Sequence, residues 1–187
     1  MIVGLVLAAG AGTRFGATKQ LAELDGRALL QHAVDAANAA AGLDRVVVVL
    51  GHEADCVRAA IDPGRAEVVV ATDWAEGQSG SLRVGLAAAG DAVDAIVVLL
   101  GDQPYVTQQA IERVLAARGD APAVRATYDG APGHPVVLER SLFAELGALR
   151  GDTGARNVLC HCRVTEVEMG SGGDDVDTPE QLEAVRR

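Results

Sequence analysis

Runs of consecutive apolar residues alternate with longer amphipathic stretches over the first two thirds of the chain. Runs without polar interruption are typical of strands buried on both faces of a parallel sheet. The expected strands are residues 2–9, 46–50, 67–71 and 95–100. Stretches with helical spacing follow each of them, at 27–41, 54–61, 81–89 and 107–118. This β-α alternation predicts a three-layer, doubly wound α/β fold with a mostly parallel, Rossmann-like sheet.

The last third is less regular. Further strands are expected at 122–128, 134–138 and 163–169, and helices at 141–149 and 154–159. A final helix has a clear start signal, with Thr178 as N-cap, Pro179 in the first turn and Gln181 three residues after the cap. No repeat or linker divides the sequence, so we expect one domain over residues 1–187.

Composition and charge narrow the function classes. Hydrophobic residues make up 49% of the 187 residues but aromatic ones only 3%, so the core must be aliphatic. The net charge of −10 disfavours nucleic acid as a partner, although a local cradle of amides and cations can still hold a small anion. No apolar run approaches the ~18 residues of a membrane span. Three cysteines make no disulfide framework, and the N-terminal residues do not resemble a signal peptide, so we expect a cytoplasmic protein.

A glycine-rich loop follows the first strand. Residues 10–16 read GAGTRFG, and small residues let backbone amides approach an anion closely. Phe15 stands where a dinucleotide fingerprint needs glycine, and Ala17 stands where a Walker A loop needs lysine. A tight strand-to-helix turn is the alternative interpretation. Arg14 and Lys19, the only lysine of the chain, favour an anion site over a plain turn.

Two aspartates are candidate metal ligands. Asp102 follows the strand at 95–100, at the sheet edge where open parallel sheets bind ligands. Asp177 belongs to an acidic cluster at 174–177. Asp102 could instead shape a turn, and the cluster could be a solvated loop. If the two meet, they form an oxygen site suited to Mg²⁺ held together with substrate phosphates.

Six motifs occur in an order that resembles a known family. They are LAAGAGTRFGATKQL, EGQSGSLRVGL, LGDQPYV, GHPVVL, GDTGARNVL and DVDTPEQL, and they span almost the whole chain. The sequence resembles the MobA-like nucleotidyltransferases, and within them the molybdenum cofactor cytidylyltransferases. The guanylyl branch usually begins Leu-Ala-Gly-Gly, and Ala9 fits the cytidylyl branch better. The resemblance implies a sheet of the nucleotide-diphospho-sugar transferase type.

The resemblance also assigns site residues. Arg14, Lys19 and Asp102 would be catalytic, the first two gripping the triphosphate, and Asp102 and Asp177 would coordinate Mg²⁺. The other nucleotide-binding residues would be Leu7, Ala8, Ala9, Gly10, Gly12, Gln78, Ser79 and Ser81. The residues facing the acceptor would be His134, Gly151, Asp152 and Arg156.

The implied reaction is attack by the terminal phosphate of a molybdopterin-type acceptor on the α-phosphorus of CTP or another NTP. Pyrophosphate leaves, and no general base is required because a phosphate nucleophile is already ionised at pH 7. The resemblance further implies transient contact with a molybdoenzyme or its chaperone. The alternatives are guanylyl transfer, a sugar or isoprenoid phosphate acceptor, or a non-catalytic cofactor carrier. A nicotinamide oxidoreductase is disfavoured because Phe15 breaks the fingerprint.

Overall fold

A seven-stranded sheet forms the centre of the computed structural model, which describes residues 1–12, 15–171 and 175–185. The strand order is β5-β4-β1-β6-β8-β7-β9, and β8 runs antiparallel to both of its neighbours. The other neighbouring strands are parallel. The strands are β1 Ile2–Ala8, β4 Arg45–Leu50, β5 Glu67–Val70, β6 Ala95–Leu100, β7 Ala123–Tyr128, β8 Ala131–Glu139 and β9 Val164–Glu168.

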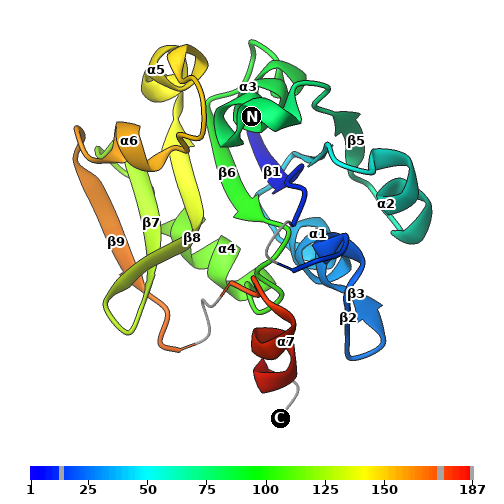
Figure 1. Ribbon diagram of the computed structural model, residues 1–187. Coiled ribbons are helices and arrows are strands. Elements are labelled where there is room, and N and C mark those ends of the chain that lie inside the picture. The colour runs from blue at the N-terminus through cyan, green and yellow to red at the C-terminus, as the bar shows by residue number, and fades with distance from the viewer. Residues whose placement is uncertain (13–14, 172–174, 186–187) are drawn as a thin grey trace.

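Helices cover both faces of this sheet (Figure 1). One aliphatic cluster joins the sheet to α1 Leu29–Ala39, α2 Ala54–Ala60 and α4 Gln108–Ala116. The cluster on the opposite face includes α3 Gln78–Ala89, α5 Phe143–Ala148 and α6 Arg156–Leu159. The predicted three-layer, doubly wound and mostly parallel architecture is therefore confirmed.

Shorter elements complete the described chain. A third small cluster packs α7 Pro179–Val185 near the hairpin of β2 Glu23–Leu24 and β3 Arg27–Ala28. Single 3-10 turns occur at η1 Lys19–Leu21, η2 Trp74–Glu76 and η3 Arg140–Leu142. Among the residues that the structure describes, no helix has the length and apolar character needed to cross a membrane.

The helix predicted at 27–41 was too long at its start. Asp25 and Gly26 both have positive φ, of 53° and 75°, and turn β2 back into β3. An Asp-Gly pair is a strong hairpin signal because both residues tolerate this conformation. Helix α1 therefore begins only at Leu29. The helix predicted at 81–89 begins earlier than expected, at Gln78.

The capping box of the last helix is confirmed. The Gln181 Oε1 atom accepts a hydrogen bond of 2.9 Å from the Thr178 backbone amide. In return, the Gln181 amide donates to Thr178 Oγ1 at 3.3 Å. This reciprocal pairing fixes where α7 begins, and so fixes the residues directly before it.

Candidate functional site

A cavity of about 410 Å³ opens at the carboxyl ends of β1 and β6. This first cavity is the place where ligands bind in open α/β sheets. Most of the nucleotide and metal residues expected from the sequence line it: Leu7, Ala8, Ala9, Gly10, Gly12, Lys19, Gln78, Ser81, Asp102 and Asp177. Arg14 lies outside the described residues, as does Asp174 of the acidic cluster.

The glycine loop is folded tightly back onto the segment that follows it. Gly12 has a φ of 60°, and a Cβ atom there would lie 3.0 Å from the Lys19 Cβ, so glycine is required. Gln20 is 5% exposed, and its Nε2 donates hydrogen bonds to Ala8 O and Gly10 O at 3.0 and 2.7 Å. Sequence reasoning missed Gln20, which ties the two ends of the loop together and thereby positions Lys19.

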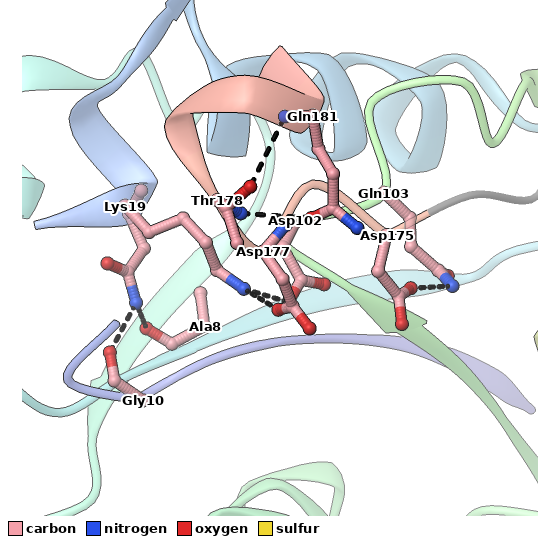
Figure 2. A network of polar contacts seen from close by, with 10 residues as sticks. Ala8, Gly10, Lys19, Asp102, Gln103, Asp175, Asp177, Thr178 and Gln181 are labelled. Carbon is pink, nitrogen blue, oxygen red and sulfur yellow. Dashed lines mark hydrogen bonds and ion pairs between the residues drawn. The ribbon is translucent and has the colours of Figure 1, made fainter. Parts of the chain in front are cut away.

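Lys19 joins the two predicted metal ligands (Figure 2). Its ammonium Nζ lies 2.6 Å from Asp102 Oδ2 and 2.8 Å from Asp177 Oδ1. The lysine side chain is 12% exposed and the two aspartates are 25% and 24% exposed. Burial lowers the pKa of Lys19, but the two carboxylates outweigh it and hold the pKa above its ordinary value of 10.5. Lys19 is therefore a charged group that binds carboxylates in this structure.

A backbone contact explains why two residues so distant in sequence meet. Asp102 follows β6, and its carbonyl oxygen accepts a 3.0 Å hydrogen bond from the Val176 amide. The Val176 side chain is fully buried and packs with Leu24 and Leu29. An apolar anchor and a capped helix therefore flank Asp177 and hold its carboxylate opposite that of Asp102.

The donor set of this carboxylate pair fits a hard divalent cation. Asp102 Oδ1 is buried and finds no hydrogen-bond partner among the described residues, so it can accept a further ligand. Mg²⁺ is usually bound by one or two carboxylates together with substrate phosphates and water. Across the described ranges, no group of three His, Cys, Asp or Glu side chains could hold a metal by itself. Two aspartates with a phosphate ligand match that pattern.

Asp175 adds a third carboxylate beside the pair. Its Oδ1 accepts a hydrogen bond of 2.5 Å from Gln103 Nε2 (Figure 2). The residue is exposed by accessible area, yet neighbouring protein atoms and the charge of Asp102 raise its pKa. The site is thus strongly acidic in the absence of a ligand.

A second cavity, of about 740 Å³, adjoins the first. Three of the four predicted acceptor residues line it, namely His134, Asp152 and Arg156. The two cavities share five lining residues: Leu7, Gln78, Leu100, Asp152 and Asp175. Burial lowers the pKa of His134 to about 4, against a small opposing effect of Asp102, although part of the residue borders the cavity. His134 is therefore neutral at pH 7.

Two predicted contact residues lie behind the cavities rather than on their listed walls. Ser79 is fully buried, and its Oγ donates to the Gly151 carbonyl oxygen at 2.7 Å. Neither residue is among the described residues lining the first or second cavity. Their bond instead fastens the start of α3 to the segment at 151–154, because a buried hydroxyl needs a partner.

Close backbone packing at Gly77 brings that segment to the shared wall. Gly77 has a φ of 108°, and a Cβ atom there would lie 2.7 Å from the backbone nitrogen and Cα of Asp152. No other residue type fits this approach without displacing the segment. Gly77 therefore places Asp152 between the two cavities.

Trp74, the only tryptophan of the chain, lines the first cavity. Its ring meets the His52 ring edge to face, with centroids 4.9 Å apart. The residue is only partly buried. Sequence reasoning left its place open because an isolated tryptophan is as compatible with a core as with a cavity wall. Its emission can report occupancy of this cavity.

The comparisons with known proteins agree with this architecture. A family model described as the MobA-like NTP transferase domain matches residues 4–166. The chain is 34% identical to nicotine blue oxidoreductase of Paenarthrobacter nicotinovorans, over 97% of this chain and 94% of that protein.

Solved structures of similar proteins cover nearly all of the chain. Rv0371c of Mycobacterium tuberculosis H37Rv is 32% identical with a TM-score of 0.89, covering 99% of this chain and 97% of the other. Rv0371c has also been solved in complex with manganese, and that structure has a TM-score of 0.86 at 33% identity, covering 98% of this chain and 97% of the other. A nucleotidyl transferase from Methanothermobacter (Mth528) is 25% identical with a TM-score of 0.83, covering 100% and 96%.

Proposed function

Because the chain belongs to the MobA-like NTP transferase family, we propose that it transfers the cytidylyl group of CTP to the terminal phosphate of a molybdopterin-type acceptor. Pyrophosphate is the second product. The observation that carries this proposal is the pair of adjoining cavities with the Lys19, Asp102 and Asp177 cluster in the first. A nucleotide in the first cavity and an acceptor in the second would meet at their shared wall.

The chemistry requires positioning and charge neutralisation more than proton transfer. The acceptor phosphate is ionised at pH 7, so its oxygen can attack the α-phosphorus directly as the bond to pyrophosphate breaks. His134 is neutral and borders the second cavity, which suits contact with an acceptor. Lys19, with Arg14, would stabilise the negative charge that collects on the departing pyrophosphate.

Asp102 and Asp177 would hold Mg²⁺, which neutralises phosphate charge when bound. The manganese complex of Rv0371c supports a divalent cation in a protein of the same family. The ammonium of Lys19 lies between these carboxylates here, and transfer to a phosphate oxygen would free both aspartates.

A reductase activity is the second candidate, favoured by the name of the 34% identical Paenarthrobacter protein. The glycine loop argues against a nicotinamide cofactor because Phe15 replaces the third glycine of the fingerprint. Other nucleotidyl transfers, to sugar or isoprenoid phosphates or from GTP, use the same carboxylate and lysine chemistry, so they are distinguished by substrate alone.

The test is a pyrophosphate-release assay with Mg²⁺, each of the four NTPs, and molybdopterin present or omitted. We expect release only with CTP and molybdopterin together. Release with another NTP or only with a sugar phosphate would reassign the substrate. Tight molybdopterin binding without release would favour a carrier, and NADH consumption in a parallel arm would favour a reductase.

A further inference from the structure

Arg125 is a charged residue in the middle of the central sheet. It lies on β7, between Val136 of β8 and Glu166 of β9. Its chain neighbours Val124 and Ala126 belong to the aliphatic cluster on one face of the sheet. Because side chains alternate along a strand, Arg125 points to the other face, where it lines the second cavity.

One of its donors is satisfied and another is not. An Arg125 Nη2 donates to Glu166 Oε1 at 2.5 Å. Its Nε is buried and has no hydrogen-bond partner among the described residues. A buried donor without a partner costs free energy, and native structures keep such groups mainly where a ligand or water completes them. The orphaned Nε of Arg125 therefore indicates a binding position.

The surroundings indicate the chemistry of the group that binds. Apolar residues such as Leu82, Val98 and Leu159 form much of the cavity wall. Neutral polar groups, including His134 and Asn157, lie among them. Glu166 already balances the charge of Arg125, so a neutral acceptor atom suits this position better than a second anion. A planar heterocycle with a ring carbonyl or ring nitrogen matches these walls.

We propose that Arg125 determines acceptor specificity by donating its Nε hydrogen bond to a carbonyl oxygen or ring nitrogen of the acceptor's heterocycle. This inference rests on the proposed function, since it concerns the part of the acceptor remote from the reacting phosphate. Arg125 would recognise the ring, and the first cavity would recognise the nucleotide.

The experiment measures binding of 6-hydroxymethylpterin, a pterin without phosphate, by calorimetry. Arg125→Met and Arg125→Lys should each weaken pterin binding roughly tenfold or more, because lysine keeps the charge but has no donor at the Nε position. Arg163→Met is the matched control, because the Arg163 Nη2 donates to the Asp120 carbonyl instead. That control should bind the pterin like the wild type.

Two further readouts separate recognition from folding. CTP affinity, followed through Trp74 emission, should stay within about threefold of wild type in every variant, which also shows that each variant folds. Glu166→Gln should keep pterin binding, since it leaves the Nε donor in place. Loss of binding in Glu166→Gln as large as in Arg125→Met would show that the ion pair acts only structurally, and would overturn the inference.

The result that overturns the inference most directly is equal pterin affinity in the wild type and Arg125→Met. That outcome leaves the proposed function intact. If the wild type binds CTP but no pterin, the pterin acceptor of the proposed function fails as well, and the inference is overturned with it.

Discussion

The Nζ atom of Lys19 lies 2.6 Å from Asp102 Oδ2, and the same ammonium reaches Asp177 Oδ1 at 2.8 Å. The sequence predicted that the lone lysine contacts phosphate, whereas the structure shows it bound by the two proposed metal ligands. One ammonium balances only part of the charge of two carboxylates. A divalent cation can therefore replace it favourably, provided that a phosphate then receives the lysine.

Replacing the lysine should make the protein depend on a divalent cation for stability. In Lys19→Met, two adjacent carboxylates lose their counter-charge, and we expect the free energy of unfolding to fall by about 2 kcal/mol in EDTA. Mg²⁺ should restore most of this loss and should stabilise the wild type less. Thermal unfolding with and without Mg²⁺ measures both effects.

Arg27→Met is the control for this experiment. Its ion pair with Asp35 is exposed, at 62% and 43%, so its loss should change stability by less than about 1 kcal/mol. Equal Mg²⁺ responses in the wild type and Lys19→Met would argue against the shared position of lysine and metal.

Neutralising either aspartate should abolish most turnover while keeping the fold. Asp102→Asn and Asp177→Asn each remove one charged contact from a preformed site, which typically costs on the order of 100-fold in rate. Circular dichroism should match the wild type. Asp35→Asn serves as a distant control, and near-normal pyrophosphate release by Asp102→Asn would remove the proposed metal role.

Acid should destabilise the fold partly through His134. Its pKa is lowered by burial from an ordinary value of 6.5 to about 4, so the unfolded chain binds a proton in that interval while the folded chain does not. The free energy of unfolding therefore falls as pH drops from 6.5 to 4, by up to about 3 kcal/mol from this group.

Urea unfolding across this pH range tests the assignment. The slope between pH 6.5 and 4 should be shallower in His134→Gln than in the wild type. His161 is an exposed histidine, so His161→Gln should leave the slope unchanged. An identical slope in the wild type and His134→Gln would show that His134 titrates normally.

Gly77→Ala should disturb the wall between the cavities. The added methyl group would lie 2.7 Å from the Asp152 backbone, in addition to the strain of a φ of 108°. Gly90→Ala is a matched control, since Gly90 also has a positive φ, of 86°, but has open space around its Cβ position. We expect Gly77→Ala to be less stable than Gly90→Ala by about 1–3 kcal/mol and to weaken CTP binding. Equal loss of stability in the two variants would mean that the backbone contact is unimportant.

Much of the fold was predictable because continuous apolar strands and helical spacing are local signals. The strands at 95–100 and the capping box of α7 are confirmed almost residue by residue. The antiparallel direction of β8 was not predictable, since strand direction depends on connections that periodicity does not encode. The Asp25-Gly26 turn did carry a local signal, which the helical pattern of the residues after it concealed.

The site was predictable where a motif marks it and not where packing creates it. Asp102 and Asp177 were expected to meet, and Lys19 shows that they do. Gln20, Gln103 and Arg125 carry no motif, and their importance follows only from hydrogen bonds between segments distant in sequence. Gly77 likewise shows its importance only through the backbone packed against it.

The most direct test of the central claim follows the phosphorus atoms of CTP. The protein is incubated with molybdopterin, Mg²⁺ and CTP labelled with ³²P at the α or the γ position. The account predicts that the α label enters the pterin product and the γ label leaves in pyrophosphate, with Asp102→Asn inactive in both. The α label remaining in CTP, or appearing only in free CMP, would contradict nucleotidyl transfer to this acceptor.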